Sequence, residues 1–215
     1  MNLERIGDIA KREMENKKSS PHNERGDKYS HGVRVAKLAI RLRQHILPNY
    51  DKEDDILVVA AWFHDICNGE VTHDLHAIVG SAKVRELLVN ECSEEELYQI
   101  CNIISIHDNR IPETEDYPTI IRIHQDADHI DHFGTMEIFR VIAQTIGHDE
   151  TIEEALNYFI NEWEEQNTYW REVLNFEVSK RIYDDKTNYM KSFIERFRVE
   201  GIGEIWDKES ILIKY

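Results

Sequence analysis

The sequence predicts an all-α protein, and two observations carry this prediction. Apolar residues recur at helical spacing along nearly the whole chain, and no Asn-Gly or Asp-Gly pair lies between two alternating runs, as a β-hairpin would require. With only 9 glycines and 4 prolines among 215 residues, turns are few. A chain of this length buries a sizeable core, so we expect one domain over residues 1–215.

The first predicted helix covers residues 29–47. Its apolar residues step at i, i+3, i+4, i+7 and i+11 from Val35, and Pro48 ends it. His31 lies in its first turn. The second helix begins at Asp54 or Asp55, and its body, ILVVAAWF, is apolar on all sides. Such an element belongs at the centre of a bundle.

His64 and Asp65 close this buried helix, ahead of a glycine turn. A third helix is predicted over residues 76–90. A fourth begins at Ser93, where Glu96 three residues later completes the pattern of a capping box. Polar residues with metal-ligating or acid-base chemistry therefore lie at helix ends.

A fifth helix is predicted to run without a break through IIRIHQDADHIDHFGTMEIFRVIA, after a loop at residues 112–118. Beyond residue 148 we predict two long amphipathic helices, over residues 153–163 and 169–198. They carry no second set of motifs. We expect them to pack on the first 145 residues and close the site; a separate domain is the alternative.

The charge balance limits the possible partners. With 26 basic and 42 acidic side chains, the net charge is −16, which disfavours general nucleic-acid binding and membrane surfaces. An anionic substrate then needs a local positive centre. The three cysteines show no C-x-x-C spacing, and there is no signal peptide or membrane span, so we expect a cytoplasmic protein.

The predicted burial of the Asp65 carboxylate indicates a positively charged centre, such as a metal ion, beside it. Asp65 follows a fully apolar helix, and an ionised carboxylate is rarely buried without a partner because its desolvation is costly. Imidazole and carboxylate together suit a divalent transition metal. His31, His64 and an aspartate of the Gln-Asp-Ala-Asp group at residues 125–128 are available to complete the site from neighbouring helices.

These residues lie in motifs that resemble a known family. His31, the His64-Asp65 pair and the late aspartate resemble the H…HD…D signature of the HD-domain metal-dependent phosphohydrolase superfamily. KYSHGVRVAKLA, HAIVGSAKVRELL and IISIHDN resemble further helices of that family, in order. QDADHIDHFGTMEIFR resembles the QDADRLDAIGAIGIAR stretch of small bacterial members, some of which hydrolyse nucleoside triphosphates. The resemblance is strong over residues 25–145 and implies a helical bundle with additional helices after residue 150.

The resemblance implies the metal ligands. They would be His31, His64, Asp65 and Asp128, with His64, Asp65 and Asp128 also serving catalysis. Asp126 and Asp128 project about 200° apart on a helix, so only one of them can face the ion. Asp128 stands at the family's Ala-Asp position, and Asp126 is the fallback. Manganese is the first expectation for the metal, and nickel, cobalt, iron, magnesium and zinc are alternatives.

Four other residues are candidates for substrate binding. His76 and His107 correspond to family positions that bind a second metal or the phosphate, and structural histidines are the alternative. Arg140 could pair with phosphate or with a core carboxylate, and Lys83 could neutralise a phosphate or lie on a solvated face. Asn68 and His129 replace two basic residues of the family pattern. Aromatic residues at helical spacing near the C-terminus favour packing over base stacking. They are Tyr158, Phe159, Trp163 and Trp170.

The resemblance implies hydrolysis of a phosphoester or phosphoanhydride in a small nucleotide-like substrate. We expect a nucleotide pyrophosphohydrolase first, a 5′-nucleotidase second, and a cyclic-nucleotide or alarmone hydrolase third, acting as a monomer or homodimer. A non-catalytic HD module that binds nucleotide or metal and signals is the main rival. A related two-iron oxygenase is a third class, which needs further ligands such as His76 and His107.

Overall fold

The computed structural model describes residues 1–18, 26–110, 117–161 and 163–206. Within these residues all regular structure is helical, apart from one isolated bridge between Asn68 and Val71, which confirms the all-α prediction. The helices are α1 (Leu3–Met14), α2 (Asp27–Ile46), α3 (Asp54–Phe63), α4 (His76–Leu88), α5 (Glu94–Ser105), α6 (Thr119–Asp131), α7 (Thr135–Gly147), α8 (Ile152–Asn161), α9 (Trp163–Glu172) and α10 (Glu177–Gly201).

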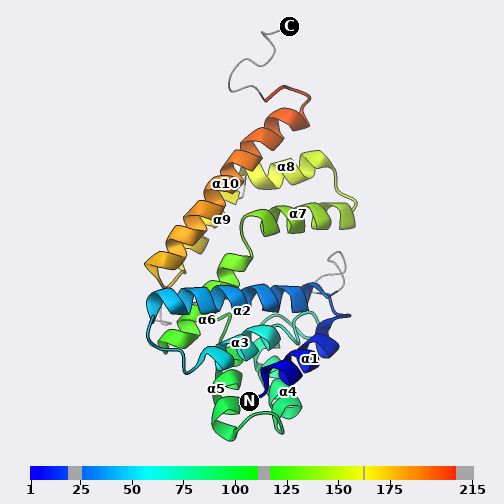
Figure 1. The fold of residues 1–215 in the computed structure, drawn as a ribbon. Coiled ribbons are helices and arrows are strands. Elements are labelled where there is room, and N and C mark those ends of the chain that lie inside the picture. Colours follow the sequence, from blue (N-terminus) through cyan, green and yellow to red (C-terminus); the bar gives the residue numbers. More distant parts are fainter. Residues whose placement is uncertain (19–25, 111–116, 162, 207–215) are drawn as a thin grey trace.

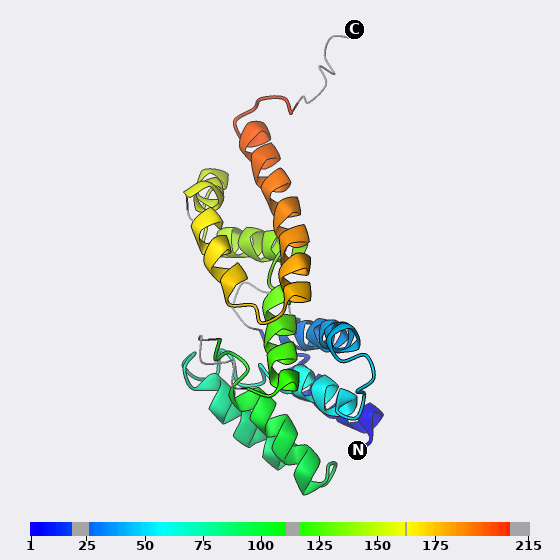
Figure 2. The same ribbon diagram turned by 90° about the vertical axis from the view of Figure 1, so that its left-hand side faces the viewer.

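Helices α1 to α6 form a body, and α7 to α10 form an extension that we call the C-terminal arm (Figure 1). Helix α10 leaves the body beside α2 and α6 and runs along the length of the arm, as both views show (Figure 2). None of the described helices combines the length and the apolarity needed to cross a membrane.

Helix α3 lies at the centre of the body, as its sequence predicts. Its side chains Leu57, Val59 and Phe63 are fully buried, and α2 packs across it. At this crossing a Cβ atom on Gly32 would lie 2.7 Å from the Ala61 carbonyl oxygen, so only glycine permits the close approach. Because Gly32 follows His31 directly, the crossing brings His31 to the end of α3.

Helix α1 was not predicted from the sequence. Asn2 caps it by accepting a hydrogen bond from the backbone N–H of Arg5 (3.1 Å). Its apolar face packs into the main core on α3. That face consists of Ile6, Ile9, Ala10 and Met14. Frequent charges on the opposite face obscured the periodicity.

The prediction of one continuous fifth helix was wrong. The chain leaves the helical conformation at Gly134, whose φ of 74° and ψ of −136° separate α6 from α7. A non-glycine residue adopts this conformation only under strain. The break directs α7 away from the body and into the C-terminal arm.

The prediction of a helix over residues 169–198 was also wrong. Helix α9 ends at Glu172, and a separate helix, α10, begins at Glu177. Between them, the Asp126 carboxylate accepts hydrogen bonds from the Asn175 backbone N–H (2.9 Å), the Asn175 side-chain amide (2.8 Å) and the Phe176 backbone N–H (3.1 Å). These bonds replace the helical hydrogen bonds that the two N–H groups would otherwise make.

The C-terminal arm has a small core of its own, built on Phe159, Trp163 and Met190. Leu174 and Tyr183, in contrast, belong to the large core of the body. The helices after residue 148 therefore pack on the first part of the chain where α10 begins, and Phe159 and Trp163 are packing residues, as predicted.

Candidate metal centre

Three helix segments meet at a buried cluster of histidines and aspartates. His31 Nε2 on α2 lies 3.0 Å from Asp128 Oδ1 on α6. His64 Nε2, just after α3, lies 3.2 Å from His31 Nε2 and 3.4 Å from the same Asp128 oxygen. The ligand atoms of these three residues are close enough to share one cation. Imidazole nitrogens and a carboxylate oxygen are suitable ligands for a divalent transition metal.

Asp65 connects this cluster to a second pair of histidines. Its Oδ2 lies 3.9 Å from His64 Nε2, and its Oδ1 lies 3.6 Å from His76 Nε2 and 3.8 Å from His107 Nε2. His64, Asp65 and His107 also present atoms close enough for one cation. The structure thus brings together all four predicted metal ligands and both candidate histidines.

Hydrogen bonds to backbone carbonyls fix the histidine rings. His64 Nδ1–H donates to Ala61 O (2.8 Å), His107 Nδ1–H donates to Ile104 O (2.7 Å), and His76 Nδ1–H donates to the His73 carbonyl. In the neutral rings that metal binding requires, each Nε2 then carries a lone pair directed into the cluster. His76 Nε2 and His107 Nε2 face one another at 3.2 Å. Two lone pairs at this distance repel unless a positive charge lies between them, so the residues fit a bound cation.

Asp131 orients His31 from behind, and the sequence analysis missed it. Its Oδ2 accepts a hydrogen bond from His31 Nδ1–H (2.8 Å), and Arg34 donates to the same carboxylate (2.9 Å). Asp131 follows Asp128 by three residues, and Arg34 follows His31 by three, so each pair shares a helix face. This i, i+3 spacing is the feature of the sequence that could have indicated Asp131 and Arg34 as neighbours of the metal ligands. A carboxylate on the distal nitrogen raises the basicity of a metal-ligating histidine.

The charge states of Asp128 and His107 suit a metal directly, whereas His31 and His64, whose pKa values are raised, would each lose a proton when a metal binds. Burial alone lowers the pKa of His31, but its hydrogen bonds to Asp128 and Asp131 raise it to about 10. Burial raises the pKa of Asp128, but Arg110 and His64 bring it well below its usual range. Burial and the nearby His64 lower the pKa of His107 to about 4. The aspartate is thus ionised and His107 neutral, as metal ligation requires.

Asp126 points away from the cluster, toward the link between α9 and α10. Of the two aspartates, only Asp128 therefore lies with the histidines. Lys83 also lies elsewhere, because its ion-pair partner is Glu70 (3.6 Å) on the loop before α4. The role of Lys83 in phosphate binding stays a prediction.

His124 on α6 is a further buried histidine beside the cluster. It is fully buried, and its ring centroid lies 5.4 Å from that of His64 and 6.2 Å from that of His107. Neither ring nitrogen has a hydrogen-bond partner among the described residues. Burial lowers the pKa of His124 well below its usual value, so its ring is uncharged and packs against His64 and His107.

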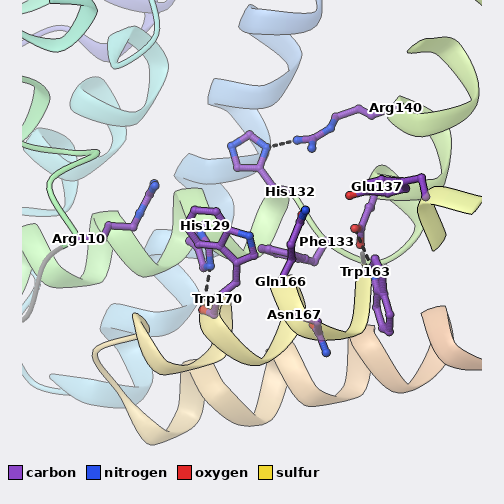
Figure 3. A pocket seen from close by; sticks show the side chains of 11 residues that line it. Arg110, His129, His132, Phe133, Glu137, Arg140, Trp163, Gln166, Asn167 and Trp170 are labelled. Atoms are coloured by element: carbon purple, nitrogen blue, oxygen red, sulfur yellow. Dashed lines mark hydrogen bonds between the residues drawn. The ribbon is translucent and has the colours of Figure 1, made fainter. Parts of the chain in front are cut away.

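A pocket of about 350 Å³ opens beside Asp128, between α6, α7 and α9 (Figure 3). Arg110, which pairs with Asp128, and His132, whose Nε2 lies 3.4 Å from Asp128 Oδ1, line its end near the cluster. Arg140 contacts the other nitrogen of His132 and lines the pocket too. Arg110 was not predicted, since no local motif marks it. Arg110 supplies a positive charge to this end of the pocket. His129 does not, because burial lowers its pKa to about 3 and keeps the ring neutral where the family pattern has an arginine.

Comparisons with known proteins agree with this description. Residues 29–133 match the sequence model of the HD domain. This segment contains His31, His64, Asp65 and Asp128 in order. This segment is therefore similar to the HD domain, as the motifs predict.

Solved structures give the same fold for nearly the whole chain. Bacillus subtilis YpgQ in complex with ADP is 17% identical, with a TM-score of 0.65, and the alignment covers 94% of this chain and 99% of YpgQ. An HD-superfamily hydrolase from Bacillus thuringiensis is 22% identical (TM-score 0.65, 94% and 97% covered). The Lin1889 protein from Listeria innocua is 23% identical (TM-score 0.63, 95% and 100% covered). Among curated proteins, no match was found. The chain thus shares its overall fold with these three proteins.

Proposed function

We propose that this protein is a metal-dependent phosphohydrolase that cleaves a phosphoester or phosphoanhydride bond of a small nucleotide. A nucleotide pyrophosphohydrolase is the first candidate and a nucleotidase the second. One observation carries the proposal: the buried cluster of His31, His64, Asp65 and Asp128 adjoins a pocket lined by Arg110 and Arg140. A cation site beside a positively charged pocket suits a phosphorylated substrate.

The metal would be held by His31, His64, Asp65 and Asp128. A divalent cation there supplies a Lewis acid that polarises a phosphoryl oxygen and lowers the pKa of water. Asp131 keeps His31 in the tautomer that directs Nε2 into the cluster. Manganese is our first choice of metal.

The remaining polar residues bind and orient the phosphate. Once a cation neutralises Asp128, Arg110 is free to pair with a phosphate oxygen. Arg140, which contacts His132, extends the positive surface along the pocket. His76 and His107 face Asp65 from the other side and would bind a second cation or a phosphate oxygen. Support for a nucleotide comes from YpgQ, which was solved with ADP.

The test combines metal content with product release. Protein purified without chelator is assayed for metal and then for phosphate and pyrophosphate release from a nucleotide panel with Mn²⁺, Co²⁺, Ni²⁺ or Mg²⁺. We expect release that requires metal and stops with chelator. Asp65→Ala should abolish it, whereas Asp184→Ala, which removes an ion pair with Arg171 on the C-terminal arm, should not. Nucleotide binding without any product release, with metal present in the site, would favour the non-catalytic module instead.

A further inference from the structure

The pocket beside the metal centre differs chemically at its two ends. Arg110 lies at the end near Asp128, while Glu137 and Trp163 lie at the opposite end, with His132 and Arg140 between them (Figure 3). One end therefore suits an anionic group. The far end offers an indole and a carboxyl group, which suit a flat group that donates hydrogen bonds.

Glu137 lies at this far end without a charge partner. It sits in the first turn of α7 and is 5% exposed. Its Oε1 accepts a hydrogen bond from Trp163 Nε1–H (2.9 Å), but its Oε2 has no partner among the described residues. No described cation forms an ion pair with it. Burial raises the pKa of Glu137 to about 7, although Arg140 and Lys186 oppose this shift.

The hydrogen bond from Trp163 uses only one carboxyl oxygen of Glu137, so it does not explain why an ionisable group and not a neutral acceptor lies here. The N-terminus of α7 has no side-chain cap, so the carboxyl group does not stabilise the helix end by a hydrogen bond. A buried acceptor without a donor is costly to the free protein. Such a group is a candidate for ligand recognition.

The ligand must combine an anionic part with a donor-bearing aromatic part, and a nucleotide has both. An ionised carboxylate only accepts hydrogen bonds. Guanine presents two adjacent donors, N1–H and the 2-amino group, on one edge. Uracil and thymine flank their single N–H with two carbonyl oxygens, which a carboxylate repels. In adenine and cytosine the amino group lies beside a ring nitrogen that is an acceptor.

We propose that Glu137 accepts hydrogen bonds from the N1–H and 2-amino edge of guanine, and that this pocket therefore selects guanine nucleotides. This inference rests on the proposed function, because it places the phosphates of the same substrate toward Arg110 and the metal. Trp163 holds the carboxyl group in position through its indole N–H.

Hydrolysis kinetics with base analogues test the proposal. GTP, ITP and XTP share the purine frame, but ITP lacks the 2-amino group and XTP carries an oxygen in its place. For the wild type with Mn²⁺ we expect kcat/KM for GTP to exceed that for ITP by about 10- to 100-fold, with XTP lower still. In Glu137→Gln the amide oxygen can still accept the hydrogen bond from Trp163, but the second carboxylate oxygen is replaced by an NH₂ group. The kcat/KM values for GTP and ITP should then become equal. Glu153→Gln is the matched control, because Glu153 is exposed on α8.

A binding experiment separates this inference from the proposed function. Calorimetric titration with GDP and IDP measures base preference whether or not the protein hydrolyses nucleotides. Loss of the GDP preference in Glu137→Gln supports the inference even if no product is released from any nucleotide. Equal affinities for GDP and IDP in the wild type, or a preference unchanged by Glu137→Gln, overturn it, and so does tighter binding of ADP or UDP. If Glu137→Gln does not fold, Trp163→Phe, which releases the carboxyl group, should reduce the preference instead.

Discussion

Replacing Asp126 and Asp128 of α6 one at a time by asparagine should separate metal binding from folding. In Asp128→Asn the cluster loses the carboxylate that lies nearest to both His31 and His64. In Asp126→Asn the amide keeps one oxygen for Asn175, but its NH₂ group then faces the Phe176 backbone N–H. The first change removes a ligand, whereas the second leaves a donor without an acceptor.

The magnitudes follow from these contacts. An unsatisfied buried N–H costs about 1–3 kcal/mol, and each kcal/mol shifts the Tm of a chain of this size by about 2–4 °C, so Asp126→Asn should lower Tm by roughly 2–12 °C. A metal at 100 times its Kd stabilises the folded state by about 2.7 kcal/mol, which corresponds to a rise of roughly 5–11 °C. The wild type and Asp126→Asn should both show this rise, and Asp128→Asn should not.

Differential scanning calorimetry with chelator and with Mn²⁺ measures both effects. The chelated samples report the folding cost, and the difference between chelated and metal-loaded samples reports metal binding. If Asp126→Asn lost the metal-induced rise while Asp128→Asn retained it, Asp126 would be the ligand and our account of the link between α9 and α10 would be wrong.

Three further predictions concern other parts of the molecule. The folded pKa of Glu137, about 7, exceeds the unfolded value of 4.5, so the metal-free protein should lose up to about 3 kcal/mol of stability as pH rises from 4.5 through 7. Because buried histidines also contribute to the pH dependence, the test is the difference in denaturant midpoint between the wild type and Glu137→Gln, which should shift against the wild type from pH 5 to pH 8; an unchanged difference would contradict the prediction. Asp131→Asn should weaken metal affinity about 10- to 100-fold in a titration, because it frees the histidine that it orients; unchanged affinity would refute this role. Gly32→Ala should destabilise the fold by about 1–3 kcal/mol in urea, since its methyl group would lie 2.7 Å from a backbone oxygen, whereas Gly7→Ala, with its nearest neighbour at 3.4 Å, should be tolerated; equal midpoints would contradict this.

Local patterns predicted the helices of the body well. The apolar run of α3 and the capping box at Ser93 and Glu96 depend on nearby residues only, and both are present. The resemblance of His31, the His64-Asp65 pair and the late aspartate to the HD signature anticipated that these side chains lie together.

The features that sequence reasoning missed depend on distant contacts. The break between α9 and α10 requires Asp126, which lies 49 residues before Asn175 in the chain. Arg110 reaches Asp128 across 18 residues without any periodic pattern. The break at Gly134 was visible only as a glycine, which an amphipathic helix tolerates at modest cost. Helical periodicity does not report such pairings.

The two attachments of α9 have a consequence for how the pocket keeps its shape. The wall formed by α7 and α9 begins at Gly134, six residues after Asp128, and returns to α6 at Asp126, two residues before it. Both ends of the wall are therefore fastened to the one helix that carries the metal ligand. The outer helix α8 reaches the pocket directly through Tyr158, but the metal centre lies at the other end of the pocket, on the helix that holds the wall in place. Substitutions at the far end of the C-terminal arm should therefore have little effect on the metal centre. That part of the sequence is free to diverge.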